Sequence, residues 1–340
     1  MEWLASRNPR TDSRYNQSVT ERVQTEPTQT GPVETALAQS KPLQTELLQI
    51  EPARQRPAPK PAWLKAPAPV GEQFHDLKRL ARSLRLNTVC ESAQCPNIGE
   101  CWRHRTATFL ILGNRCTRRC GFCAVPKGRP EAIDFDEPRR VAEAVRALGL
   151  EYAVITSVDR DDDLMGGARA FALVIAEIRR QAPGCRVEVL IPDFQGDREA
   201  IRRVVEAGPE VLNHNLESVP RLYPAVRAGA RYERSLELLR YSKMLRPGGL
   251  TKSGVMVGLG EETSELLEVF GDLAAVGCGI LTIGQYLRPS RDQLPMSRLY
   301  TPCEFAELKA AALEMGFRHV ESGPLVRSSY HAHLQSVTTA

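Results

Sequence analysis

The sequence predicts an α/β protein with a partial (β/α)6 barrel, and two observations support this fold class. From residue 106 onwards, six apolar runs alternate with six amphipathic segments, an order that is typical of parallel strands joined by helices. Polar segments end the apolar runs, as they do at the strand ends of TIM-type barrels. Periodicity alone leaves open the choice between such a barrel and a doubly wound sheet.

The six apolar runs are the predicted strands. They are TATFLILG (106–113), YAVITSV (152–158), VEVLIPDF (187–194), VLNHNLE (211–217), SGVMVGLG (253–260) and ILTIGQYL (280–287). Short runs that are apolar almost throughout are typical of parallel strands, because helices cover both faces of such a sheet.

The amphipathic segments between and after these runs are the predicted helices. They span residues 137–149, 168–182, 197–208, 233–248, 263–277 and 301–316. Gly149, Gly208 and Gly277 suit the left-handed position that follows a helix. The last helix opens with Thr301 as N-cap and Glu304 three residues later, which together predict a capping box.

Composition and charge limit the class of protein. The chain has 340 residues, 42% hydrophobic and 25% charged, enough for one large barrel or two domains. A net charge of +4 does not indicate nucleic acid as a partner, and we expect none. No apolar run approaches the ~20 residues that cross a bilayer, so we expect no membrane association. The N-terminus lacks the order of a secretory signal, and nine cysteines then favour a reducing compartment, the bacterial cytoplasm.

Residues 1–60 differ from the rest of the chain in composition. They are rich in Gln, Thr, Glu and Pro, a composition that buries too little apolar surface to offset its ordering entropy. We therefore predict a disordered extension. A short helix over residues 34–51, interrupted by Pro42, is the alternative.

Six of the nine cysteines lie within 34 consecutive positions, in two groups of three. The groups are Cys90, Cys95 and Cys101, before the first predicted strand, and Cys116, Cys120 and Cys123, directly after it. Three thiolates on a short loop suit a [4Fe–4S] cluster with one open iron. A structural zinc site is the alternative, but it needs a fourth soft ligand. We expect Cys185, Cys278 and Cys303 to be ordinary buried or half-buried thiols.

The open iron of such a cluster can be chelated by a small molecule that carries both an amine and a carboxylate. S-adenosylmethionine carries both beside a reducible sulfonium, and electron transfer from the cluster breaks a C–S bond to give a carbon radical. Phe122 fits an aromatic wall against the adenine, with simple loop packing as the alternative. The barrel topology places these groups at the carboxyl ends of the strands, together with the other polar segments.

Eight segments carry a resemblance to a known family. They are TVCESAQCPNIGECW, RCTRRCGFCAV, TSVDRDD, HNLESVPRLY, YERSLELL, KSGVMVGLGE, LTIGQYLRPS and SGPLVRSSYHA. With these segments, from about Pro61 to His333, the sequence resembles the radical S-adenosylmethionine enzymes and, among them, the lipoyl synthase family. In one departure, DLM precedes Gly166 and Gly167, where the family commonly has Leu-Pro-Asp. We expect a loop of the same length with altered local contacts.

The resemblance implies two [4Fe–4S] clusters with S-adenosylmethionine. It assigns Cys116, Cys120 and Cys123 to the cluster that cleaves S-adenosylmethionine. It assigns Cys90, Cys95 and Cys101 to an auxiliary cluster, with Ser329 of RSSY as the fourth ligand. Ser328 is the lesser candidate, and without the resemblance both serines are expected only to hydrogen-bond the C-terminal segment.

The resemblance also implies the reaction and the partners. The reaction is insertion of two sulfur atoms at C6 and C8 of an octanoyl chain on a lysine of a lipoyl carrier domain, with the auxiliary cluster as sulfur donor. The carriers are 2-oxoacid dehydrogenase E2 subunits and the glycine cleavage H protein. An electron donor such as flavodoxin or ferredoxin and an iron–sulfur carrier complete the set. Basic residues near the mouth of the barrel are expected to steer an acidic carrier by charge complementarity.

We expect four regions in the chain. They are the extension 1–60, the auxiliary-cluster segment 61–105, the radical barrel 106–318 and a C-terminal segment 319–340 that supplies the serine ligand.

Several polar residues at the strand ends are candidates for cofactor contacts. Thr156 and Ser157 are expected to hold the methionine amine of S-adenosylmethionine, with simple loop capping as the alternative. Glu217 is expected to accept the ribose hydroxyls of the cofactor. For His214 and Asn215, a satisfied buried network is an equal alternative to a cofactor contact.

The charged residues of the same loops are open to several interpretations. Asp159, Asp161 and Asp162 either orient Arg160 or cap the next helix, or form a solvated acidic loop. Arg118 and Arg119 either contact the cofactor carboxylate or stay solvated.

Three functional hypotheses of different classes follow from the sequence. The first is the sulfur-inserting radical enzyme, which requires both cysteine triplets and RSSY. The second is another radical enzyme, for which a different auxiliary ligand pattern is expected. The third is a non-catalytic module stabilised by metal, which six β-α units with polar strand ends disfavour.

Overall fold

The computed structural model describes residues 61–66, 69, 71–93, 95–103 and 106–335. All of them belong to one compact unit, Ala58–Ala340. The extension predicted over residues 1–60, with its alternative helix over 34–51, lies outside the described residues.

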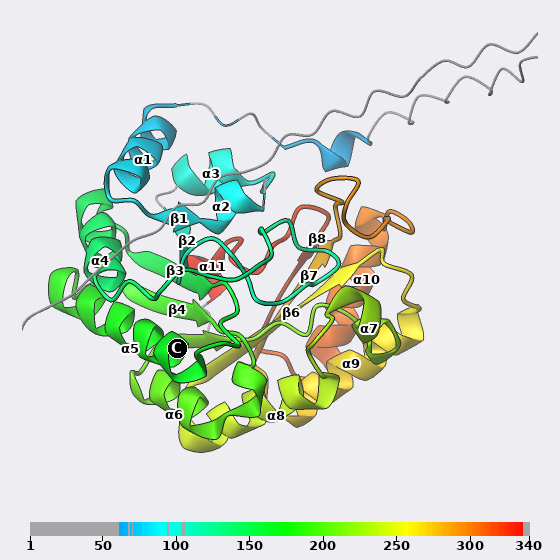
Figure 1. The fold of residues 1–340 in the computed structure, drawn as a ribbon. Coiled ribbons are helices and arrows are strands. Elements are labelled where there is room, and N and C mark those ends of the chain that lie inside the picture. Colours follow the sequence, from blue (N-terminus) through cyan, green and yellow to red (C-terminus); the bar gives the residue numbers. More distant parts are fainter. Residues whose placement is uncertain (1–60, 67–68, 70, 94, 104–105, 336–340) are drawn as a thin grey trace, which may run out of the picture. The chain divides into compact units, whose positions relative to one another are not determined.

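An eight-stranded sheet forms the centre of this unit, in the order β1 to β8 (Figure 1). Its strands are β1 (Asn87–Thr88), β2 (Ala107–Ile111), β3 (Tyr152–Ser157), β4 (Arg186–Leu190), β5 (Val211–Asn213), β6 (Leu250–Val257), β7 (Ile280–Gln285) and β8 (His319–Gly323). All neighbours from β2 to β8 are parallel, and β1 is antiparallel to β2. Within the described ranges the two edge strands do not pair, so the barrel is open. The predicted α/β partial barrel is confirmed.

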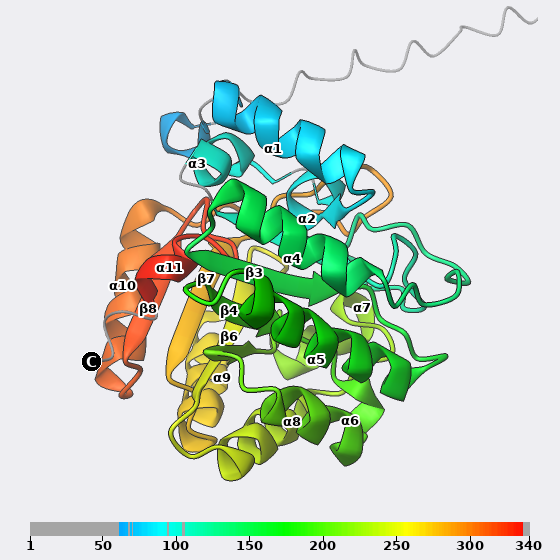
Figure 2. The same ribbon diagram turned by 90° about the vertical axis from the view of Figure 1, so that its left-hand side faces the viewer.

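Helices follow the strands and cover the outer face of the sheet, as Figures 1 and 2 show. They are α4 (Glu137–Leu148), α5 (Leu164–Gln181), α6 (Arg198–Glu206), α8 (Tyr232–Leu245), α9 (Thr263–Ala275) and α10 (Pro302–Glu314). Gly149, Gly208 and Gly277 all have positive φ, as predicted for residues that end helices. Thr301 and Glu304 form the predicted capping box of α10.

The six predicted strands are all present, but all of them end before their apolar runs do, β4 and β5 by the largest margin. β4 ends at Leu190, and the chain then forms a left-handed turn in which Phe194 and Gln195 have φ values of 43° and 51°. β5 ends at Asn213, so His214 and Asn215 already belong to the loop. These strands end where buried polar side chains form hydrogen bonds to other loops, and the sheet does not continue there.

Two strands were not predicted, and both lie at the edges. β1 has only two residues. In β8 the sequence is HVESG, and only Val320 is buried, so the strand has no apolar run. Its pairing with β7, from Ile280–His319 to Gly284–Gly323, depends on a neighbour distant in the chain.

The main core lies between the sheet and its outer helices. Phe171, Val174 and Ile178 of α5 are fully buried and belong to one apolar cluster with Ile155 of β3 and Val189 of β4. Their spacing of three and four residues places them on one face of α5. This packing fixes the strands whose carboxyl ends carry the site.

The N-terminal described segment packs on the β2 edge of the sheet. It contains α1 (Glu72–Ser83), α2 (Val89–Ser92) and α3 (Ile98–Arg103). Phe74 of α1 stacks on Trp102 of α3, with 4.9 Å between the ring centroids. Trp102 is 1% exposed, so this stack joins α1 to α3, the helix that carries Cys101.

The C-terminal segment after β8 crosses to the N-terminal segment. Asn97 donates a hydrogen bond to the Leu325 carbonyl at 2.6 Å, and Tyr330 donates to the Glu100 carboxylate at 3.1 Å. The short helix α11 (Ala332–Gln335) buries Ala332 against Tyr152 and Val154 of β3. The two segments that flank the barrel in sequence are therefore neighbours in space.

A buried ionic network crosses four neighbouring strands. The Lys252 ammonium lies 2.9 Å from Glu188 Oε1, and both side chains are at most 1% exposed. Tyr152 donates to Glu188 Oε2 at 2.8 Å, and Asn213 donates to Oε1 at 3.0 Å. The carboxylate thus has three donors, which offset the cost of removing it from water.

No described helix has the length and apolar character needed to span a bilayer.

Replacing Lys252 with Met is expected to destabilise the protein, because it leaves the Glu188 carboxylate buried without its cation. The expected loss is about 3–5 kcal/mol of unfolding free energy, measured by urea denaturation of the metal-free protein. The control, Lys252→Met with Glu188→Gln, removes both charges and should recover most of the loss. A single variant as stable as the wild type would contradict this assignment.

Candidate functional site

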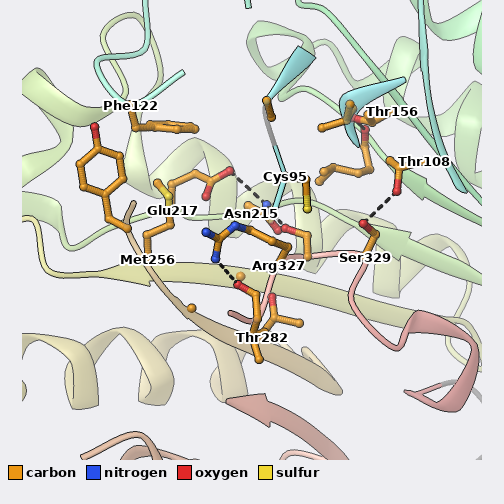
Figure 3. Close-up of a pocket in the computed structure, with 18 of the residues that line it drawn as sticks. Cys95, Thr108, Phe122, Thr156, Asn215, Glu217, Met256, Thr282, Arg327 and Ser329 are labelled. Atoms are coloured by element: carbon orange, nitrogen blue, oxygen red, sulfur yellow. Dashed lines mark hydrogen bonds between the residues drawn. The ribbon is translucent and has the colours of Figure 1, made fainter. Parts of the chain in front are cut away.

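Two adjoining cavities lie inside the barrel and at the carboxyl ends of its strands. The Ser329 cavity has a volume of about 240 Å³ and is lined by Cys90, Cys95, Ser328 and Ser329 among others (Figure 3). The Cys120 cavity has a volume of about 190 Å³ and is lined by Cys116, Cys120 and Cys123 among others. Residues that line both are Val89, Phe122, Thr156, Leu190, Asn215 and Glu217. The two cavities therefore share a wall, and each receives thiols from one triplet.

The loop after β2 turns back on itself around Cys116. The Cys116 N–H donates to the Pro126 carbonyl at 2.9 Å, and the Gly128 N–H donates to the Cys116 carbonyl at 3.0 Å. These bonds make an isolated parallel bridge between Cys116 and Lys127. The loop is thus held by its own backbone as well as by its neighbours.

Gly121, between the second and third cysteines of the loop, packs with no room for a side chain. A Cβ there would lie 2.5 Å from the Ala225 carbonyl oxygen and 2.8 Å from the Leu294 side chain. The Gly121 N–H donates to the Val226 carbonyl, and its carbonyl accepts from the Leu294 N–H. The cysteine loop is therefore clamped between the loop around α7 (Tyr223–Val226) and the loop after β7.

Arg118 is the centre of an ionic network that the sequence did not predict. Its side chain is 4% exposed and pairs with Asp161 at 2.8 Å, with Asp159 at 3.4 Å and with the fully buried Asp193. Asp193 also accepts from Arg234 of α8 at 2.7 Å. The expectation that Arg118 is solvated or free for a cofactor carboxylate is wrong, because protein carboxylates already occupy its guanidinium. Burial lowers the pKa of Arg118, but its carboxylate partners more than offset this effect and raise the pKa above its ordinary value. The guanidiniums in turn hold the pKa of Asp193 well below its usual range.

The remaining residues of the acidic loop divide between two roles. Asp162 pairs with Arg160 at 2.8 Å, as one interpretation of the sequence predicted. The cap of α5 is Asp163, whose carboxylate accepts from the Gly166 N–H, and not Asp159, Asp161 or Asp162. This bond lies in the DLM departure, where the loop keeps a capped helix start.

The thiols of the cysteine loop are mostly removed from water. Burial raises the pKa of Cys116 to about 11 and that of Cys120 to about 12, and it also raises that of Cys123. Within the described part of the chain, no three His, Cys, Asp or Glu side chains converge to hold a single metal ion. At neutral pH the thiols of the metal-free chain are protonated, so binding of iron must release protons.

Two buried polar atoms in the cavity walls have neither a hydrogen bond nor an ion pair within the described residues. Ser157 Oγ, on the Cys120 cavity, and Asn215 Oδ1, on both, are buried and have no hydrogen bond within the described residues. Thr156, predicted with Ser157, instead donates to the Leu190 carbonyl at 2.9 Å. Buried polar atoms are normally satisfied, so these orphans fit a polar ligand in the Cys120 cavity.

Glu217 brings a buried carboxylate to the shared wall. It has φ of 67° and is held by two backbone bonds to β6, with Gly254 and Met256. Asn215 donates to its Oε1 at 3.0 Å, and burial raises its pKa. In Figure 3 Glu217 and Phe122 lie on the same side of the pocket. This arrangement is compatible with the ribose and adenine roles expected for them.

Arg227 is a lining residue of the Cys120 cavity that sequence reasoning missed. It donates to the Asn215 carbonyl at 2.7 Å and to Ser235 Oγ at 3.2 Å. No ion pair with a carboxylate is formed by this guanidinium among the described residues. Burial lowers its pKa, but Tyr223 and Glu217 nearby raise it overall. The only signal in the sequence was a lone arginine in the YPAVRAG turn after HNLES.

His214 belongs to a satisfied buried network. Its Nδ1 lies 2.8 Å from the Ile191 carbonyl and its Nε2 lies 3.0 Å from Ser235 Oγ. Burial lowers its pKa to about 3, so the ring stays neutral at physiological pH. Of the two interpretations of the sequence, the structural one describes its contacts.

The first cysteine triplet gathers on α2 and α3, beside the C-terminal segment. Cys90 lies in α2 and Cys101 in α3, and the Cys95 N–H between them donates to the Cys90 carbonyl. Burial raises the pKa of Cys90 to about 11. Burial and the nearness of Cys90 and Cys95 raise the pKa of Cys101 still further. Three largely buried thiols therefore lie near one another beside the C-terminal segment, and thiols are the usual ligands of iron–sulfur clusters.

The two serines of RSSY point to different partners. Ser329 Oγ accepts from Thr108 Oγ1 of β2 at 2.8 Å, whereas Ser328 Oγ accepts from Asn215 at 2.6 Å. Figure 3 shows Ser329 beside Cys95 in the same pocket. Both serines line the Ser329 cavity with Cys90 and Cys95. The structure therefore brings Ser329 to the same cavity as Cys90 and Cys95 of the first triplet, whereas Cys101 is not among the residues that line it.

The other predicted residues are placed as follows. Cys185 and Cys278 are buried, as expected, but Cys303 is exposed because it lies on the outer face of α10. Arg119 is exposed, which agrees with the solvated interpretation.

Comparisons with known proteins give the class of this protein first. The model of the radical SAM superfamily matches residues 110–273, which span β2 to α9 and the cysteine loop. The model of the N-terminal domain of lipoyl synthase, of the same superfamily, matches residues 5–95. With its partial barrel and its cysteine loop, the protein is a radical SAM enzyme.

The relatives give the particular family. The chain is 70% identical to the lipoyl synthase of Koribacter versatilis (strain Ellin345), over 84% of this chain and 94% of the relative. It is 62% identical to the lipoyl synthase of Rubrobacter xylanophilus, over 82% of this chain and 86% of the relative. The solved structure of Streptococcus suis SuiB bound to S-adenosylmethionine is similar over 71% of this chain and 57% of that chain, with 11% identity and a TM-score of 0.49. The chain belongs to the lipoyl synthase family.

Gly121→Ala is expected to disrupt the cysteine loop, because the added methyl collides with the Ala225 backbone and Leu294. We expect reconstituted protein to lose most of the iron bound by this loop, counted against the wild type. Gly184→Ala is the control, because a Cβ at Gly184 meets nothing within 4 Å. Equal iron contents in the two variants would show that the clamp on Gly121 does not hold the loop.

Proposed function

We propose that this enzyme inserts two sulfur atoms, at C6 and C8, into an octanoyl chain that is amide-linked to a lysine of a lipoyl carrier domain. The product is the lipoyl cofactor. The observation that carries the proposal is the shared wall of the Ser329 and Cys120 cavities. A substrate in this space has one cysteine triplet on each side.

The residues that would hold the inorganic groups follow from the two cavities. Cys116, Cys120 and Cys123 would hold the cluster that acts with S-adenosylmethionine. Ser329, with the first triplet, would hold an auxiliary [4Fe–4S] cluster, and buried thiols suit both clusters. When bound, the first cluster with S-adenosylmethionine supplies a carbon radical that abstracts hydrogen, and the auxiliary cluster supplies sulfur.

The polar residues of the shared wall would bind S-adenosylmethionine. Glu217 presents acceptors for the ribose hydroxyls, and Phe122 presents a ring to the adenine. The unpartnered Ser157 hydroxyl, with Thr156 next to it, would hold the methionine amine. Arg227 supplies a buried positive charge for the methionine carboxylate, a role that its lack of a carboxylate ion pair supports.

The Ser329 cavity has an apolar lining that suits an alkyl chain. Its walls include Val154 of β3, Leu190 of β4, Met256 of β6 and Val326 of the C-terminal segment. Burial of a methylene group contributes about 0.8 kcal/mol, so these residues would hold the octanoyl chain while they exclude water. Gly284 of β7 faces the Val326 carbonyl so closely that no Cβ fits, and this glycine lets Val326 reach the cavity.

The partners remain those that the family implies. Lipoyl carrier proteins are the substrates, and E2 subunits and the H protein are the carriers we propose. An electron donor and an iron–sulfur carrier are required by the chemistry of the two clusters. The use of thiols as ligands favours a reducing compartment, for which we propose the cytoplasm.

The direct test is incubation of the reconstituted protein with S-adenosylmethionine, a reductant and an octanoyl-lysine peptide, followed by mass analysis. We expect two added sulfur atoms and formation of 5′-deoxyadenosine. Cys120→Ala should abolish 5′-deoxyadenosine formation and retain the auxiliary iron, about half of roughly eight irons per chain. Undiminished 5′-deoxyadenosine in this variant, or no sulfur added by the wild type, would overturn the proposal.

Ser329 and Ser328 form a matched pair for testing the serine ligand. Ser329→Ala should lower auxiliary iron and abolish sulfur insertion, whereas Ser328→Ala should retain both. Ser329→Cys should keep the iron but suppress sulfur insertion, because a serine oxygen is a harder and more easily displaced ligand than a thiolate. Full activity in Ser329→Ala would refute ligation, and full activity in Ser329→Cys would refute a need for the weaker ligand.

A further inference from the structure

The loop that carries the second cysteine triplet is strongly basic. Residues 113–130 contain five basic residues and no acidic one. Arg118 is buried among three carboxylates, as described above. The other four are exposed: Arg115, Arg119, Lys127 and Arg129. We call these four residues the cationic rim.

The charges of the cationic rim are not balanced by the protein. None of the four makes an ion pair within the described ranges. Arg129 acts electrostatically on Asp162, but that carboxylate is already paired with Arg160 at 2.8 Å. An exposed group of like charges without partners is destabilising by itself, which indicates a role outside the fold.

Three of the rim residues are neighbours in space. The backbone bridge between Cys116 and Lys127 brings residues 115 and 127–129 together. Arg115 Nη1 lies 3.7 Å from the position of a Cβ on Gly128, which lies between Lys127 and Arg129. Figure 2 shows the connection from β2 to α4 projecting from the edge of the barrel. These three exposed cations therefore share one turn of the loop that carries Cys116.

We propose that the cationic rim docks the acidic face of a one-electron donor protein. This inference rests on the proposed function, which needs a cluster at the three thiols of the loop. In the transfer, the reduced donor loses one electron and the cluster gains it. No bond is made or broken, and no proton moves.

The position of the rim favours the donor over the acylated carrier as its partner. Lys127 lines the Cys120 cavity, and no rim residue lines the Ser329 cavity. A protein docked on the rim is separated from the second triplet only by the loop itself. The acyl chain has to enter the Ser329 cavity, whose lining contains no rim residue. Complementary charge raises association rates by several powers of ten at low salt.

The binding test compares two triple variants of the reconstituted enzyme. The first, Arg115→Gln, Arg119→Gln and Arg129→Gln, neutralises the rim and spares the cavity residue Lys127. The second, Arg146→Gln, Arg203→Gln and Arg318→Gln, removes three exposed cations elsewhere that also make no ion pair within the described ranges. The probe is flavodoxin, an acidic one-electron donor. We expect its Kd to rise at least about tenfold for the first variant, with a weaker dependence on salt, and to stay unchanged for the second.

The activity test separates docking from chemistry. With reduced methyl viologen, a small cationic reductant, both variants should form 5′-deoxyadenosine at the wild-type rate. With reduced flavodoxin at limiting concentration, only the rim variant should be slower, again by about tenfold or more. If the wild type forms no 5′-deoxyadenosine with methyl viologen, the proposed function fails and the flavodoxin Kd alone decides the docking.

Two outcomes would overturn the inference. The first is a flavodoxin Kd that is the same for the rim variant and the wild type. The second is a selective loss of activity on an octanoylated carrier domain when methyl viologen is the reductant, because the rim would then serve the carrier. In that case the expectation that basic residues steer the carrier would hold instead.

Discussion

The ion pairs of Arg118 are the constraint on which the site depends. This guanidinium, between Cys116 and Cys120 in the chain, pairs with Asp161 and Asp159 of the loop after β3 and with Asp193 of the loop after β4. One buried cation thereby connects three loops. Asp193 also pairs with Arg234, which connects the same network to α8. Because a buried charge without its partner costs several kcal/mol, none of these loops can move alone. The cysteine loop consequently presents its thiols from a fixed frame, although it has no regular secondary structure of its own.

Much of the fold could be predicted from local patterns. Apolar runs and amphipathic segments located six strands and six helices, because burial on both faces of a parallel sheet leaves a signal in every strand. The capping box of Thr301 and Glu304 was also predictable, because both residues lie within one turn of the helix. The spacing of the cysteines was enough to predict two sets of three. The roles of Phe122, Glu217 and Ser329, by contrast, came from the resemblance to a family and not from a physical pattern in the sequence. Those roles remain proposals.

What sequence reasoning missed has its partners far away in the chain. β8 has one buried residue and gains its strand geometry from β7. Arg118 and Arg227 were invisible as buried cations because their partners come from other loops, and charged residues are almost always exposed in the absence of such partners. The predicted strands also extend beyond the observed ones, again because the contacts that end them come from distant parts of the chain. Near the site, polar contacts between loops compete with continuation of the sheet, and hydrophobic periodicity does not report them.

The contacts between the two flanking segments constrain when the auxiliary site can exist. Thr108 and Ser329 are 221 positions apart, and Tyr330 and Glu100 are 230 apart. By contrast, the lining of the Cys120 cavity ends at Arg227, well before the end of the chain. During synthesis, the residues that line the Cys120 cavity are therefore made before the serine, and Leu294, which clamps Gly121, is made between them. The Ser329 cavity is complete only once the segment after β8 has been made, so it forms later in synthesis than the lining of the Cys120 cavity.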